Sequence, residues 1–175
     1  MSKPFEGCRV YYSGSIKGVP ESDPEFPWKL VQYMGANGAD VLSEHVAGRN
    51  QQEMDEIRAR RIGTTIQRLK EDPAPWFGIR RQDLAWVDES THVVALVNAP
   101  SLGVGVEIQR AIDKPRLGLN LTPVLCLVRS DILPKLSYMI RGISTDESRL
   151  FQLREYTTLE SAQRHIYDFL TSRKK

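Results

Sequence analysis

The stretch 93–112 constrains the fold of this chain more than any other. It begins with the unbroken apolar run 93–97, which is typical of a strand buried on both faces of a parallel sheet. A turn with one proline, one serine and two glycines follows (98–105). Apolar side chains then recur every four residues, as on the inner face of a helix: Val104, Ile108 and Ile112. A strand, a glycine-rich turn and a helix can bind phosphate, because free N–H groups at the helix start face the ligand.

A carboxylate, Glu107, is expected in the first turn of this helix. Phosphate and carboxylate are both negative, so a bound phosphate would not normally have this neighbour. The pattern favours a substrate whose anionic end is held by Ser101 and the turn, while Glu107 acts on the other end.

Strands and helices alternate along the rest of the chain. We expect strands at 9–13, 40–43, 93–97, 123–128 and 151–156. We expect helices at about 28–35, 50–70, 104–112 and 158–170, and a short helix that Asp83 opens. This alternation predicts an α/β fold with a doubly wound, mostly parallel five-stranded sheet, in a Rossmann- or flavodoxin-like three-layer sandwich. A length of 175 residues suits a single domain, 1–175.

Composition excludes several classes of function. The net charge of +2 is too weak to indicate nucleic-acid or membrane binding, and no apolar run is long enough to span a bilayer. We therefore expect a soluble protein in the cytoplasm or the nucleus. Cys8 and Cys126 are expected to be buried reduced thiols, and the His and Cys positions give no metal spacing.

Polar residues follow the strands at the edge where ligands bind in such sheets. The set is Tyr11, Ser13, Ser15, Lys17, His45, Ser101 and Glu107, with Asp83 in reach. Hydroxyls, free amides and a lysine suit one phosphate, whereas two carboxyl groups suit acid–base or nucleophilic work on a sugar. The dinucleotide glycine fingerprint, the Walker pattern and the Gly-x-Ser-x-Gly elbow are all absent from the sequence.

Five sequence segments, in order, resemble one known family. They are Tyr11-Tyr12-Ser13-Gly14-Ser15-Ile16-Lys17-Gly18, Ser43-Glu44-His45-Val46-Ala47, Gln82-Asp83-Leu84-Ala85-Trp86, Pro100-Ser101-Leu102-Gly103-Val104-Gly105-Val106-Glu107 and Ser137-Tyr138-Met139-Ile140-Arg141-Gly142. Together they resemble the 2′-deoxynucleoside 5′-phosphate N-hydrolases, in the nucleoside 2-deoxyribosyltransferase superfamily.

The resemblance implies a reaction and three catalytic residues. The reaction is hydrolysis of the N-glycosidic bond of (deoxy)nucleoside 5′-monophosphates to free base and (deoxy)ribose 5-phosphate, through a covalent glycosyl-Glu intermediate and without a metal or organic cofactor. Glu107 is the implied nucleophile, Asp83 the acid that assists departure of the base, and Tyr11 the group that orients Glu107.

The resemblance also implies a set of substrate-binding residues. Gly14, Ser15, Ile16, Lys17 and Gly18 would form a cradle for sugar and phosphate. Ser101 and Gly103 would donate to the phosphate, and His45 would lie near the base or the cleft wall. In a homodimer, Ser137 would reach the phosphate from the other subunit, with Met139 beside it near the base.

The sequence departs from the family pattern in two places. Lys17 stands where the family usually has arginine, which removes a bidentate phosphate contact. A helical insertion near 49–80 makes that stretch longer than expected and affects the expected base preference. Three alternatives stay open at this point: base transfer between deoxyribosides, hydrolysis of ribonucleotides, and a non-catalytic nucleotide-binding module.

Overall fold

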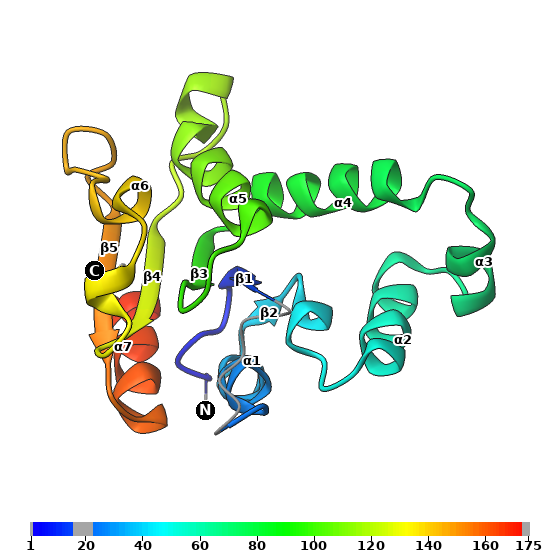
Figure 1. Ribbon diagram of the computed structural model, residues 1–175, viewed down its shortest axis with the longest axis horizontal. Coiled ribbons are helices and arrows are strands. Elements are labelled where there is room, and N and C mark those ends of the chain that lie inside the picture. Colours follow the sequence, from blue (N-terminus) through cyan, green and yellow to red (C-terminus); the bar gives the residue numbers. More distant parts are fainter. Residues whose placement is uncertain (1, 16–22, 173–175) are drawn as a thin grey trace.

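The computed structural model describes residues 2–15 and 23–172, and within them the strands form one sheet (Figure 1). The strands are β1 (Arg9–Gly14), β2 (Asp40–Val41), β3 (His92–Leu96), β4 (Val124–Arg129) and β5 (Phe151–Tyr156). Their order is β2-β1-β3-β4-β5, and every neighbouring pair is parallel. The predicted five-stranded, doubly wound α/β fold is therefore confirmed.

Helices cover both faces of the sheet. The helices of the described residues are α1 (Phe26–Ala36), α2 (Gln51–Ile62), α3 (Ile66–Glu71), α4 (Pro75–Glu89), α5 (Leu102–Asp113), α6 (Tyr138–Arg141) and α7 (Leu159–Thr171), with 3-10 turns at Glu44–Ala47, Lys114–Leu117 and Leu133–Lys135. Figure 1 shows α4 and α5 on one side of the sheet and α1 and α7 on the other. Among the described residues, none of the helices has the length and apolar character that a transmembrane span requires.

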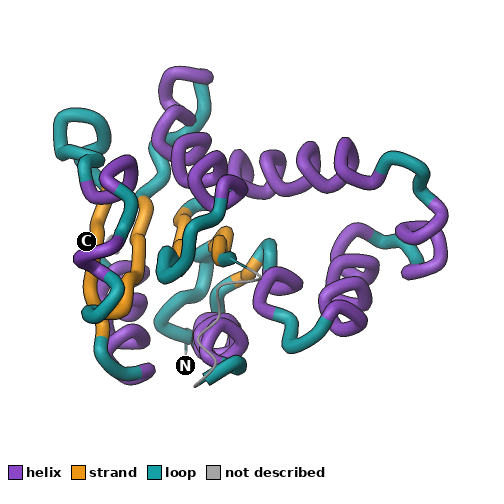
Figure 2. The backbone as a smooth tube through the Cα atoms, in the orientation of Figure 1, coloured by secondary structure: helices purple, strands orange, loops and turns teal. Residues whose placement is uncertain are grey.

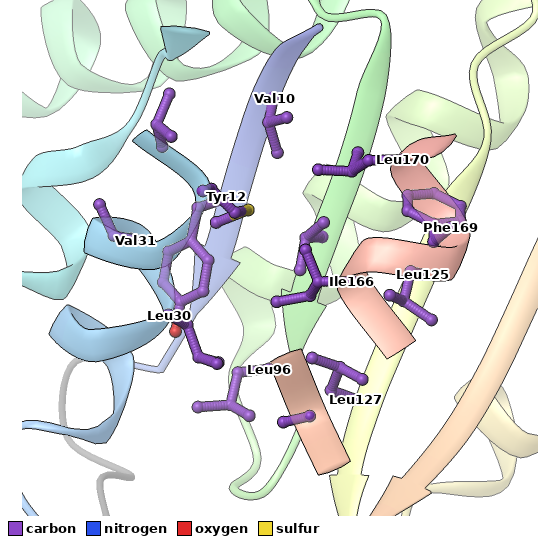
Figure 3. Packing of buried hydrophobic residues seen from close by; sticks show 14 of the residues in the cluster. Val10, Tyr12, Leu30, Val31, Leu96, Leu125, Leu127, Ile166, Phe169 and Leu170 are labelled. Carbon is purple, nitrogen blue, oxygen red and sulfur yellow. The ribbon is translucent and has the colours of Figure 1, made fainter. Parts of the chain in front are cut away.

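Alternation along the strands divides the core into two layers, because successive strand side chains point to opposite faces. On β1, Tyr12 packs in the layer that α1 and α7 cover, whereas Tyr11 packs beneath α4 and α5. Figure 3 shows the first layer, with Tyr12, Leu125 and Leu127 from the strands near Ile166 of α7. All residues of β3 are buried, which explains the apolar run that follows His92.

The single helix expected at 50–70 is wrong, because the chain forms two helices there. Gly63 adopts φ +70°, a left-handed conformation that ends α2 and that glycine reaches at little cost. Asn50 caps the start of α2, and Thr65 caps a new helix, α3. Local capping therefore outweighed the apolar periodicity, which continues across the break.

Two expected helix positions also need correction. Asp83 does not open a helix: α4 begins at Pro75, so Asp83 lies in its middle, two turns from the start. Glu107 lies in the second turn of α5 instead of the first, because that helix begins at Leu102. Proline favours the first turn of a helix, and this moves the start of α4 to Pro75.

Residues 51–82 extend away from the sheet (Figures 1 and 2). They comprise α2, α3 and the first half of α4, and we call them the helical arm. They occupy the place of the expected insertion near 49–80.

The carboxyl ends of β1 and β3 lie side by side, with Ser13 opposite Ala95 and Gly14 opposite Leu96. After β1 the chain continues to α1 on one face, and after β3 it continues to α5 on the other face. This is the switch point at which ligands bind in doubly wound sheets.

Candidate active site

A cavity of about 1000 Å³ opens at this switch point. Its floor comes from the segments that follow β1 and β3, one wall comes from the second half of α4, and the outer wall comes from the helical arm. The volume lies at the upper end of the range for small-molecule sites. The cavity is therefore the candidate active site.

The cavity brings together seven of the residues that the sequence nominated: Gly14, Ser15, His45, Asp83, Ser101, Gly103 and Glu107. Tyr11 is fully buried beside them in the layer under α4 and α5. Ile16, Lys17 and Gly18 lie outside the described residues. Ser137 and Met139 do not line the cavity; both are exposed at the start of α6, where the Ser137 hydroxyl accepts a hydrogen bond from the Met139 amide.

Glu107 projects from α5 toward the end of β1. The Ser13 hydroxyl donates a hydrogen bond of 2.5 Å to its Oε2 atom. Burial raises the pKa of Glu107, while the hydroxyl groups of Ser13 and Tyr11 oppose the rise and the charge of Asp83 adds to it. The carboxylate is thus held by hydroxyl donors yet little solvated, which keeps it available for an electron-poor carbon.

Tyr11 points its hydroxyl toward the same carboxylate. Burial raises the pKa of Tyr11 far above its usual value, and the charges of Glu107 and Asp83 raise it further. The phenol is therefore a neutral donor. Its oxygen is buried without a hydrogen-bond partner of ordinary geometry among the described residues, so the orientation of Glu107 by Tyr11 stays a prediction.

Asp83 reaches the cavity from the middle of α4. Burial raises its pKa, and the nearby Arg58 guanidinium of α2 lowers it. The Arg58 Nη2 and Asp83 Oδ1 atoms are 3.6 Å apart. A carboxyl with a raised pKa that faces a cavity is a candidate proton donor.

His45 lies in the 3-10 turn after β2 and is buried in the cavity wall. Burial and the charge of Arg58 lower its pKa to about 3. Its ring centroid is 5.5 Å from that of Trp86, at a tilted angle. His45 is therefore a neutral ring in the wall and is not a source of positive charge for phosphate.

Ser101 is the N-cap of α5, where its hydroxyl accepts a hydrogen bond of 3.4 Å from the Val104 amide. Ser101, Gly103 and Val104 all line the cavity. The start of a twelve-residue helix thus borders the cavity, and both its amides and its dipole favour an anion there.

For two residues of the site, Ser13 and Arg58, the sequence predicted no individual role. Ser13 was placed at the correct edge, and its position two residues after Tyr11 puts it on the face toward α5. Arg58 stands in an arginine-rich stretch of the kind that is usually solvated, although it follows Met54 by four residues and both face the cavity. Helical spacing from the apolar Met54 was the available signal.

In the described part of the chain, no three His, Cys, Asp or Glu side chains form a group that could hold a metal ion.

Comparison with known proteins identifies the family. No family model matches the chain. The chain is similar to the 5-hydroxymethyl-dUMP N-hydrolase of Tetraodon nigroviridis, with 34% identity over 166 residues that cover 95% of this chain and 99% of the relative. Identity to the Rattus norvegicus protein of the same name is 38% over 149 residues, 85% of this chain and 77% of the relative.

A third relative carries the broader family name. It comes from Trichoplax adhaerens, its name proposes it as a 2′-deoxynucleoside 5′-phosphate N-hydrolase, and it is 36% identical over 135 residues, 76% of this chain and 74% of the relative. The level of identity and the coverage of both chains confirm the resemblance that the sequence motifs indicated. The chain belongs to the 2′-deoxynucleoside 5′-phosphate N-hydrolase family.

Proposed function

We propose that this chain is an N-glycosidase that hydrolyses 2′-deoxynucleoside 5′-monophosphates to free base and 2-deoxyribose 5-phosphate. The observation that carries the proposal is a single cavity with two partly buried carboxyl groups, Glu107 and Asp83, next to the start of α5. The names of the relatives, which describe N-hydrolases of such nucleotides, support it.

The proposed first step joins Glu107 to the sugar. As the bond between the base and C1′ breaks, positive charge develops on the sugar ring, and a carboxylate below the ring stabilises it. The Glu107 oxygen then bonds to C1′, while the base takes the electron pair and a proton from Asp83. Water subsequently attacks C1′ and releases deoxyribose 5-phosphate, with Asp83 as the base.

The proposed phosphate site lies at the start of α5. Ser101 and the free amides near Gly103 would donate hydrogen bonds to the phosphate, helped by the helix dipole. Charge-assisted hydrogen bonds contribute about 1.5–3 kcal/mol each. Two or three of them would favour a nucleotide over a nucleoside by roughly a thousandfold.

A substrate panel tests the proposed function. Purified protein is incubated with deoxynucleoside monophosphates, including 5-hydroxymethyl-dUMP, and free base is measured by chromatography. We expect base release from at least one nucleotide and a rate roughly a thousandfold lower for the matching nucleoside, because the phosphate contacts are then lost. Parallel incubations with ribonucleotides measure tolerance of the 2′-hydroxyl. If no nucleotide releases base, the proposed function is wrong.

We further propose a homodimer in which Ser137 and Met139 complete the partner's site. Exposed apolar side chains on α5 and α6 support a contact between two protein subunits at these helices. Leu102 at the start of α5 is 93% exposed, and Met139 on α6 is 83% exposed. Large apolar groups left open to water frequently mark interaction surfaces.

Mixing two inactive variants tests this dimer. Ser137→Asp places a negative charge against the phosphate, and Glu107→Gln removes the nucleophile. If Ser137 acts across the interface, random subunit exchange restores roughly a quarter of the sites, because half of the dimers are mixed and each holds one intact site. Glu107→Gln mixed with Asp83→Asn is the control and should restore nothing, since both residues belong to one subunit's site. Equal, background-level activity in both mixtures would contradict the shared site.

A further inference from the structure

Arg58 is a charged side chain of the cavity that has no part in the mechanism above. It lies on α2 of the helical arm, lines the cavity, and its side chain is 12% exposed. The side chain of Arg60, on the same helix, is 74% exposed. The positive charge of Arg58 lowers the pKa of Tyr11, His45 and Asp83, so it acts on three groups of the site.

Asp83 alone does not account for this buried cation. The contact between the two side chains is a single ion pair of 3.6 Å, longer than a hydrogen bond. The Asp83 Oδ1 atom is buried and has no hydrogen-bond partner among the described residues. A guanidinium has five N–H donors and commonly binds a carboxylate through two of them. Arg58 therefore keeps donor capacity that faces the cavity.

We propose that Arg58 binds the departing base and stabilises the negative charge that develops on its carbonyl oxygens. This inference rests on the proposed function, and it assigns the helical arm a role in catalysis. The ligand it implies is a base with carbonyl groups next to the ring nitrogen, as in uracil and its 5-substituted forms.

A cation beside the departing base is useful because the base becomes negatively charged in this step. When the bond to C1′ breaks, its electron pair moves onto the base, and the charge spreads to the carbonyl oxygens. N–H donors of Arg58 stabilise these oxygens while Glu107 bonds to C1′. Asp83 then gives its proton to the base and becomes a carboxylate beside Arg58, which favours that ionised form.

The experiment measures how base release depends on the leaving group. Arg58→Met and Arg58→Lys are compared with the wild-type protein on the 5-fluoro, 5-hydroxymethyl and 5-methyl deoxyuridine monophosphates, whose bases leave with increasing difficulty in that order. Arg58→Met should lower kcat about 10- to 100-fold for the 5-methyl base and much less for the 5-fluoro base. Arg58→Lys keeps a cation and should recover part of the loss.

Arg60→Met is the matched control, because it removes a cation from the exposed side of the same helix. The rates of this variant should stay within about twofold of the wild-type rates. An equal loss for all three bases would mean that Arg58 only supports the structure of the arm. No loss would mean that Arg58 takes no part in the reaction. Either result overturns the inference while the proposed function stands. If the wild-type protein releases no base, both proposals fail.

Discussion

Glu107→Gln should lower base release by a factor on the order of a thousand or more, the largest effect that we expect from one substitution. The amide keeps the shape of the side chain but cannot donate an electron pair to C1′ as a carboxylate does. Its oxygen can still accept the hydrogen bond that Ser13 now gives to the carboxylate. The loss should therefore appear in kcat, with little change in nucleotide binding, and steady-state kinetics with a binding titration separate the two.

A trapped intermediate would identify the nucleophile directly. Rapid acid quenching of the wild-type protein during turnover, followed by mass spectrometry of its peptides, should find deoxyribose 5-phosphate on the peptide that contains Glu107. The same procedure on Glu107→Gln should find no adduct. An adduct on another residue would contradict the assignment of the nucleophile.

The same variant should be folded, and its stability relative to the wild type should increase as pH rises. Burial raises the folded-state pKa of Glu107 above its usual value of 4.5, so the folded protein holds this proton more tightly than the unfolded chain. This contribution is fully present below that value and is lost as pH rises through the higher folded-state pKa. The difference in free energy of unfolding between Glu107→Gln and wild type should therefore move in favour of the variant as pH rises above 4.5 and through the higher folded-state pKa. Denaturant unfolding across this range measures it.

A matched control exists on the same helix. Asp113 ends α5 outside the cavity lining and forms an ion pair with Arg116. Asp113→Asn should change base release by no more than about twofold, because exposed pairs contribute little. If Glu107→Gln kept a rate similar to that of Asp113→Asn, the proposed mechanism would be wrong.

Asp83→Asn should lower base release by about 100- to 10,000-fold, the usual contribution of a positioned proton donor. Asn cannot give a proton to the departing base. Burial raises the pKa of Asp83 despite Arg58, so the protonated acid persists to higher pH than for an exposed aspartate. Wild-type activity should fall as pH rises through this pKa, and the fall should disappear in the variant. A pH profile of kcat from about pH 4 to pH 9 measures both.

The control for Asp83 lies on the same helix. Glu89 ends α4 on the protein surface, where it pairs with Arg9 at 3.1 Å. Glu89→Gln should retain the wild-type rate within about twofold and the wild-type pH profile. An unchanged alkaline limb in Asp83→Asn would show that another group supplies the proton.

Local patterns predicted most of the fold. The buried run of β3 and the spacing of Val104, Ile108 and Ile112 gave the central strand and helix, because periodicity reports directly which side chains are buried. They did not give the break at Gly63 or the start of α4 at Pro75. Both depend on capping and turn conformations, which compete with a periodicity that continues past them.

The sequence by itself determined the α/β class, the family, and the edge of the sheet to which Glu107, Ser101 and His45 belong. Only the tertiary structure decided which groups touch: Ser13 on Glu107, and Arg58 of the helical arm beside Asp83 of α4. The physical reason is that strand and helix periods fix the direction of a side chain relative to its own element. Distances between elements depend on how the elements pack, and pKa values depend on the burial that this packing creates.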